Sequence, residues 1–110
     1  MTFDDYQQLA LKTAQNDYEP TMQRTIWAMG VAGEAGEVIE KWKKIIAYKQ
    51  GVVSDEDKAE LGKELGDVIW YIAVLAESLG LTFEEVMQVN VKKLADRQKR
   101  NVIKGAGDNR

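Results

Sequence analysis

The chain has 110 residues, of which 45% are hydrophobic and 30% are charged, and its length suits one domain built around one core. It contains no cysteine and no histidine, which excludes disulfides, thiol catalysis, a Ser-His-Asp triad and zinc sites made of Cys or His. The net charge of −3 disfavours binding to nucleic acid by phosphate attraction, and no apolar run is long enough for a membrane span. The polar start MTFDDYQQ does not have the pattern of a signal peptide, so we expect a cytoplasmic location.

Four segments carry apolar residues at helical spacing, and we expect helices at about residues 3–15, 22–48, 55–78 and 82–100. Thr2 and Ser54 are placed as N-caps of the first and third helices, and Thr82 with Glu85 forms a capping box for the fourth. Gly80 follows the third helix, in the position where a glycine commonly ends a helix. No segment alternates with a period of two, so we expect no sheet.

These helices predict an all-α fold, with one four-helix, bundle-like domain over residues 1–100 and a Gly-rich polar tail over residues 101–110. The second helix carries an apolar stripe, in which Trp42 is expected to belong to the core. The apolar faces are broad for so small a chain, which favours a homo-oligomer.

An acidic motif, E-x-G-[E/D]-V-I, occurs twice, beginning at Glu34 in the second helix and at Glu64 in the third. Each copy places two carboxylates three residues apart on one helix face, and the second members are Glu37 and Asp67. If the two helices pack antiparallel, the four carboxylates converge, and oxygen ligands of this kind suit Mg²⁺ or Mn²⁺. The glycines between the acids would then allow the helices and an ion to approach closely.

A solvated acidic face with local ion pairs is the simpler interpretation of such a cluster. It fits Glu37, which has Lys41 four residues later, and Asp67, which has Lys63 four residues earlier. It does not fit Glu34 and Glu64, which have no cation at helical spacing and border apolar residues, where a charged form is costly. The pairing pattern therefore favours a metal cluster, and a metal cage without His or Cys suggests phosphate chemistry.

The fourth helix offers groups suited to phosphate, because Asn90, Lys93 and Arg97 follow one another at steps of three and four residues. The alternative is that Lys93 and Arg97 only complement the dipole at the end of the helix.

These residues resemble the MazG-type nucleoside triphosphate pyrophosphohydrolases, whose signature is ExxE on one helix and ExxD on the next. The segments GEAGEVIEKWKK, KELGDVIWYIAVLA, LGLTFEEV and NVKKLADR are all similar to that family. The resemblance implies an all-α homodimer or homotetramer that hydrolyses a (deoxy)nucleoside triphosphate to the monophosphate and pyrophosphate with Mg²⁺. The acidic charge of the chain and its lack of a long apolar run predict no nucleic-acid or membrane partner.

Residue by residue, the resemblance assigns the metal to Glu34, Glu37, Glu64 and Asp67, and the orientation of the attacking water to Glu34 or Glu37. It matches Asn90, Lys93 and Arg97 to nucleotide-contacting residues, and Lys44 to a basic residue that touches phosphate. Among the aromatic residues, Tyr71 is the best placed to stack on a base, whereas Trp27 and Trp70 are expected in the core. The tail, with Lys104, Asp108 and Arg110, either closes over a bound nucleotide or frays.

Two alternatives stay open. One is a phosphoribosyl-ATP or dUTP pyrophosphohydrolase of the same superfamily, because the sequence does not determine the base pocket. The other is a non-catalytic helical interaction module, which the presence of acids at all four motif positions disfavours.

Overall fold

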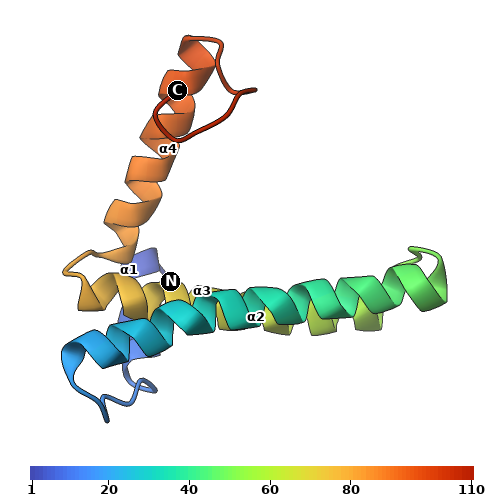
Figure 1. The fold of residues 1–110 in the computed structure, drawn as a ribbon, viewed down its shortest axis with the longest axis horizontal. Helices are drawn as coiled ribbons and strands as arrows, with labels where there is room; N and C mark the ends of the chain where they lie inside the picture. Colours follow the sequence, from blue (N-terminus) through green and yellow to red (C-terminus); the bar gives the residue numbers. More distant parts are fainter.

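The computed structural model describes residues 1–110, and its regular elements are four α-helices with no strand. They are α1 (Phe3–Leu11), α2 (Pro20–Lys49), α3 (Asp55–Ser78) and α4 (Phe83–Lys99). Helices α2 and α3 lie side by side as a long antiparallel stem, and α1 packs across one end of it (Figure 1). Helix α4 leaves that end at a bend of 103° relative to α3 and contacts α1 and α3 but not α2.

The all-α prediction is confirmed, but the four helices of one chain do not close into a single bundle. The stem and α4 form two arms of an L, with α1 at the corner (Figure 1). No single helix has both the length and the apolar composition to cross a bilayer. Helices α3 and α4 together have that length and composition, but a bend separates them.

Local sequence signals set most helix ends. Thr2, Ser54 and Thr82 each cap their helix as predicted, by accepting a hydrogen bond from its third backbone N–H. The capping box predicted at Thr82 is present, and Thr2 with Asp5 and Ser54 with Asp57 form two further boxes. Helix α2 begins two residues earlier than expected, because Pro20 occupies its first position and Glu19 caps it.

Helix α1 is shorter than predicted, and a side chain explains where it ends. The hydroxyl of Thr13 donates to the carbonyl oxygen of Ala10 at 3.0 Å, and it accepts the indole N–H of Trp70 at 2.8 Å. Hydroxyl groups that bond to nearby backbone in this way compete with helix propagation. The helix therefore ends at Leu11, and Thr13 contacts α3 through Trp70.

The turn between α2 and α3 is fixed at the far end of the stem. Gln50 and Gly51 both have left-handed backbone angles, with φ values of 52° and 79°. Lys49 then contacts both carboxylate oxygens of Asp57, at 2.9 and 2.8 Å. Hydrogen bonds from Lys49 and from the backbone N–H of Ser54 lower the pKa of Asp57 to about 2. The ion pair between Lys49 of α2 and Asp57 of α3 therefore stays charged at neutral pH.

The core lies at the corner, where side chains from all four helices meet. Its buried members are Ala10, Trp27, Ala73, Val74 and Phe83. Trp27 is thus a core residue, as predicted.

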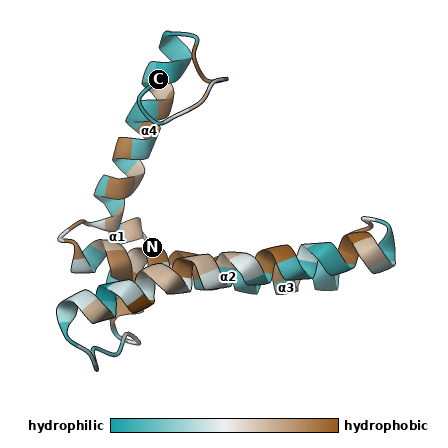
Figure 2. Cartoon of the chain, viewed as in Figure 1, coloured by the Kyte–Doolittle hydropathy of each residue, from teal (hydrophilic) through white to brown (hydrophobic).

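The prediction that Trp42 lies in the core is wrong, because this side chain is 45% exposed. Beyond the corner, α2 packs on α3 alone, so no further helix covers the outer faces of the stem (Figure 1). Figure 2 shows hydrophobic residues recurring along the stem and α4. The large exposed apolar side chains of the stem include Ile39, Trp42, Ile46, Leu65 and Ile69.

A buried glutamine determines how α4 meets the rest of the chain. Gln7 is 3% exposed, and its amide nitrogen donates to the carbonyl oxygens of Ala73 at 3.0 Å and Leu81 at 3.1 Å. Its amide oxygen accepts the backbone N–H of Phe83, the first residue of α4, at 3.1 Å. The Gln7 side chain therefore binds α1, α3 and α4 together at the corner.

Candidate active site

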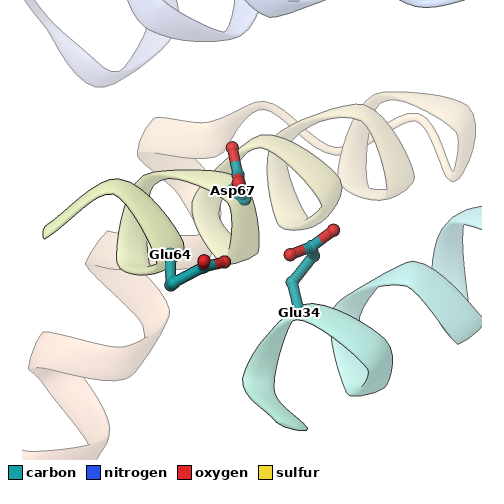
Figure 3. A group of neighbouring side chains, drawn as sticks. All are labelled: Glu34, Glu64 and Asp67. Carbon is teal, nitrogen blue, oxygen red and sulfur yellow. The ribbon is translucent and has the colours of Figure 1, made fainter. Parts of the chain in front are cut away.

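Three carboxylates from facing helices converge on the stem. Glu34 extends from α2, and Glu64 and Asp67 extend from α3 (Figure 3). Each offers one oxygen, and these oxygens all lie within 4.8 Å of one another. The antiparallel packing that the repeated motif required is therefore present.

The charges around this acidic trio (Glu34, Glu64 and Asp67) are poorly balanced. Partial burial, and then the nearby charges of Asp67, Glu64 and Glu37, raise the pKa of Glu34 above its ordinary value. Glu34 forms no ion pair, whereas Glu64 lies 3.5 Å from the ammonium of Lys41. A lone lysine facing three carboxylates leaves net negative charge, which a hard divalent cation with oxygen ligands would neutralise. The donor set therefore fits Mg²⁺ or Mn²⁺.

Glu37 lies outside the trio, and its side chain is exposed. The local ion pairs that the sequence suggested for the motif acids are absent. Lys41 instead reaches across to α3, where it contacts Glu60 at 3.6 Å and Glu64 at 3.5 Å, and Lys63 contacts Glu60 at 2.9 Å. Spacing along one helix could not reveal the two pairs of Lys41, because they join α2 to α3.

The structure also corrects the role given to the motif glycines. A Cβ atom added at Gly33, Gly36 or Gly66 would meet no atom within 4 Å, so these glycines are not needed for close packing inside one chain. The close contact occurs one turn earlier, at Gly30, where an added Cβ would lie 2.2 Å from the ring of Tyr71.

Tyr71 lies against Gly30 and lines a hollow of about 380 Å³ beside the acids. The other lining residues are Thr13, Glu34, Asp67 and Trp70. The rings of Trp70 and Tyr71 meet edge to face, with centroids 5.0 Å apart, and the hydroxyl of Thr13 holds the Trp70 indole. Trp70 is only partly buried, so two aromatic rings adjoin the acidic trio. Thr13 was not predicted, because it belongs to no motif and meets the site only through the fold.

We expect Gly30→Ala to displace the Tyr71 ring, since the new methyl group cannot occupy the same space. If Tyr71 contacts the substrate base, the KM should rise about tenfold, corresponding to roughly 1.4 kcal/mol of lost stacking. Steady-state kinetics measure the change. Gly33→Ala is the matched control: its methyl group meets nothing, so it should leave KM unchanged and favour the helix by about 1 kcal/mol. Equal kinetics for the two variants would contradict a role for Tyr71.

The predicted phosphate-binding residues are not beside the acids within one chain. Asn90 is exposed on α4, the arm that leaves the stem at the corner (Figure 1). Lys93 and Arg97 contact the chain's own tail, through the carboxylate of Asp108 at 2.9 and 3.2 Å.

Lys44 is on the same helix as Glu34 but farther along the stem, by about 15 Å at a rise of ~1.5 Å per residue. It is exposed and lies 4.0 Å from Glu40. One chain thus joins three of the four motif acids with Tyr71, and leaves Lys44 and the three α4 residues apart from them.

Comparison with known proteins identifies the family to which the chain belongs. The chain matches the MazG nucleotide pyrophosphohydrolase domain over residues 23–102. The chain belongs to the MazG family. The matched region includes both copies of the acidic motif of this chain and all of α4. Helix α1, the following residue Thr13 and the tail residue Asp108 lie outside it.

Two relatives show where the similarity extends. The chain is 50% identical over 82 residues to the Gene 37 protein of Mycobacterium phage L5. These 82 residues make up 74% of this chain and 72% of that protein. It is also 48% identical over 42 residues to the uncharacterized protein YvdC of Bacillus subtilis (strain 168). These 42 residues make up 38% of this chain and 40% of that protein. No solved structure matches the chain.

Proposed function

We propose that this MazG protein is a Mg²⁺-dependent nucleoside triphosphate pyrophosphohydrolase that converts a (d)NTP to the (d)NMP and pyrophosphate. The observation that carries the proposal is the acidic trio, in which Glu34 has no counter-ion although two further carboxylates lie within 4.8 Å. A trio of this kind is costly to maintain unless a cation binds to it. Membership of the MazG family supports the reaction class.

Glu34, Glu64 and Asp67 would hold the metal, and Glu37 would complete the set from the next turn of α2. A divalent ion bound there supplies neutralisation of phosphate oxygens and activation of a water molecule. Glu37 is exposed and forms no ion pair, so its carboxylate is available to orient the attacking water. Trp70 and Tyr71 would receive the base in the adjoining hollow.

Asn90, Lys93 and Arg97 would bind phosphate from α4, and Lys44 would add a further cation from α2. Because these groups lie apart from the trio in one chain, we propose that a second copy completes the site, in a homodimer or in a tetramer of such dimers. The exposed apolar residues of the stem, and of α4 at Val91 and Leu94, provide surface for this association.

We expect Trp42→Glu to disrupt the homo-oligomer, because it places a charge in the exposed apolar surface of the stem. The loss of a central aromatic contact costs roughly 2 kcal/mol or more, so the dimer should dissociate at least about thirtyfold more readily. Light scattering on the purified protein measures the mass. Tyr18→Glu, in the loop before α2, is the control and should remain associated. A monomeric wild-type protein, or a Trp42→Glu variant of unchanged mass, would refute the shared site.

A non-catalytic interaction module is the second candidate, and the exposed stem surface is the observation that favours it. A panel of canonical and modified NTPs and dNTPs, with phosphoribosyl-ATP and dUTP, separates the candidates. Pyrophosphate release from a few members in Mg²⁺, and none in EDTA, would support hydrolysis and identify the substrate class. The absence of release from every member by folded protein would leave the interaction module.

A further inference from the structure

The tail, residues 101–110, folds back beside the end of α4 and closes on itself (Figure 1). The guanidinium of Arg110 donates to the carbonyl oxygens of Val102 at 3.0 Å and Ile103 at 2.9 Å. Arg100 in turn donates to the main-chain oxygen of Arg110 at 2.6 Å. Gly105 passes so close to Arg110 that an added Cβ would lie 2.8 Å from its side chain. The tail is therefore an ordered loop with specific internal contacts.

The loop presents one carboxylate to the basic pair on α4. An oxygen of Asp108 accepts hydrogen bonds from Lys93 at 2.9 Å and from Arg97 at 3.2 Å, and Arg97 also donates to the main-chain oxygen of Asp108. These two cations lower the pKa of Asp108, so the carboxylate is charged at neutral pH.

Arg97 is buried, whereas the Asp108 side chain that it binds is exposed. It is 4% exposed, and its Nε atom is buried without a hydrogen-bond partner. The carboxylate that it binds belongs to a side chain that is 80% exposed. A guanidinium offers five N–H donors in a planar fork, and an ammonium offers three. One carboxylate oxygen and one carbonyl oxygen use only part of this capacity, so a more highly charged anion would bind the pair better.

We propose that the tail is an autoinhibitory latch, in which Asp108 occupies the Lys93–Arg97 pair and must leave before a phosphate group can bind there. The nature of the competing anion rests on the proposed function, in which these two residues hold nucleotide phosphates. The proposal that the tail is a latch rests on the contacts of Asp108 with Lys93 and Arg97. It predicts that the apparent affinity for phosphate is reduced by the fraction of time that the tail is docked. If the tail is docked about 90% of the time, the apparent Kd is raised about tenfold.

Release of the tail is measured by limited trypsin digestion, since Lys104 lies within the loop and is exposed. Cleavage of a segment that opens and recloses quickly follows the population of its open form. Inorganic pyrophosphate is the probe, and EDTA keeps metal from the acidic trio. Pyrophosphate should accelerate cleavage after Lys104 up to about tenfold, relative to NaCl of equal ionic strength. Protection from cleavage, or an unchanged rate, would overturn the latch.

Asp108→Asn should open the latch without pyrophosphate. Its cleavage should be about tenfold faster than that of the wild type and should no longer respond to the probe. Asp55→Asn, which removes the same charge from a fully exposed position at the start of α3, is the control and should behave as the wild type does. If Asp108→Asn is cleaved at the wild-type rate, Asp108 does not hold the tail.

The two proposals fail in different ways. If pyrophosphate frees the tail but no nucleotide is hydrolysed, the latch stands and the proposed reaction is wrong. If nucleotides are hydrolysed while pyrophosphate leaves cleavage unchanged, the reaction stands and the latch is wrong. In an active protein, Asp108→Asn should also lower the KM about tenfold with little change in kcat, because it removes a competitor of the substrate.

Discussion

Glu34→Gln should lower kcat/KM for nucleotide hydrolysis about a thousandfold, corresponding to roughly 4 kcal/mol of lost transition-state stabilisation. The same change should raise the Tm of the metal-free protein by a few degrees. Partial burial and then the nearby carboxylates raise the pKa of Glu34 in the fold, so at pH values above that pKa its charge destabilises the folded chain relative to the unfolded chain. A neutral amide of the same shape removes that penalty. Steady-state kinetics and thermal unfolding in EDTA measure the two effects.

The opposite signs of these effects make the prediction specific. Glu40→Gln is the charge-matched control on the same helix, because Glu40 contacts Lys43 and Lys44 rather than the trio, and it should retain activity. Glu37→Gln should abolish turnover with a smaller gain in Tm, because Glu37 stands outside the trio. If Glu34→Gln stays active, or melts below the wild type in EDTA, Glu34 is held by the protein rather than by a metal.

Gln7→Leu should have the largest effect on stability. It removes hydrogen bonds to Ala73, Leu81 and Phe83 at a position that is 3% exposed, and it leaves the buried N–H of Phe83 without a partner. One buried polar group without a partner costs about 1–3 kcal/mol, and several are affected here. We expect a loss of about 3 kcal/mol, which lowers the Tm of a domain of this size by roughly 15 °C. Calorimetry measures the change.

Gln8→Leu is the control for that experiment, since Gln8 is the exposed neighbour of Gln7 on α1 and forms no hydrogen bond across the corner. It should leave the Tm almost unchanged. If Gln7→Leu and Gln8→Leu have the same Tm, α4 does not depend on the Gln7 side chain for its position. Loss of the bend would also detach α4 from the corner and thus move Lys93 and Arg97.

The features that the sequence predicted well depend on residues close together in the chain. The caps at Thr2, Ser54 and Thr82 and the stop at Gly80 follow from residues within a few positions of each helix end. The convergence of Glu34 with Glu64 and Asp67 follows from the repeated motif once two adjacent helices pack antiparallel.

The features that were missed depend on contacts between distant segments. Gln7 and Thr13 act through residues of α3 and α4, and no motif marks them as contacts between helices. Lys41 pairs with α3 instead of its own helix, and Trp42 is exposed because no third helix covers the stem. A pattern along one helix reports which residues share a face, but it does not report what, if anything, covers that face.

Phosphorus NMR of the products formed from one nucleoside triphosphate, in Mg²⁺ and in EDTA, tests the central claim most directly. We predict a nucleoside monophosphate and pyrophosphate in equal amounts with Mg²⁺, and no turnover in EDTA or by Glu34→Gln. The formation of a nucleoside diphosphate and phosphate, or equal turnover in EDTA, would contradict pyrophosphohydrolysis at the acidic trio.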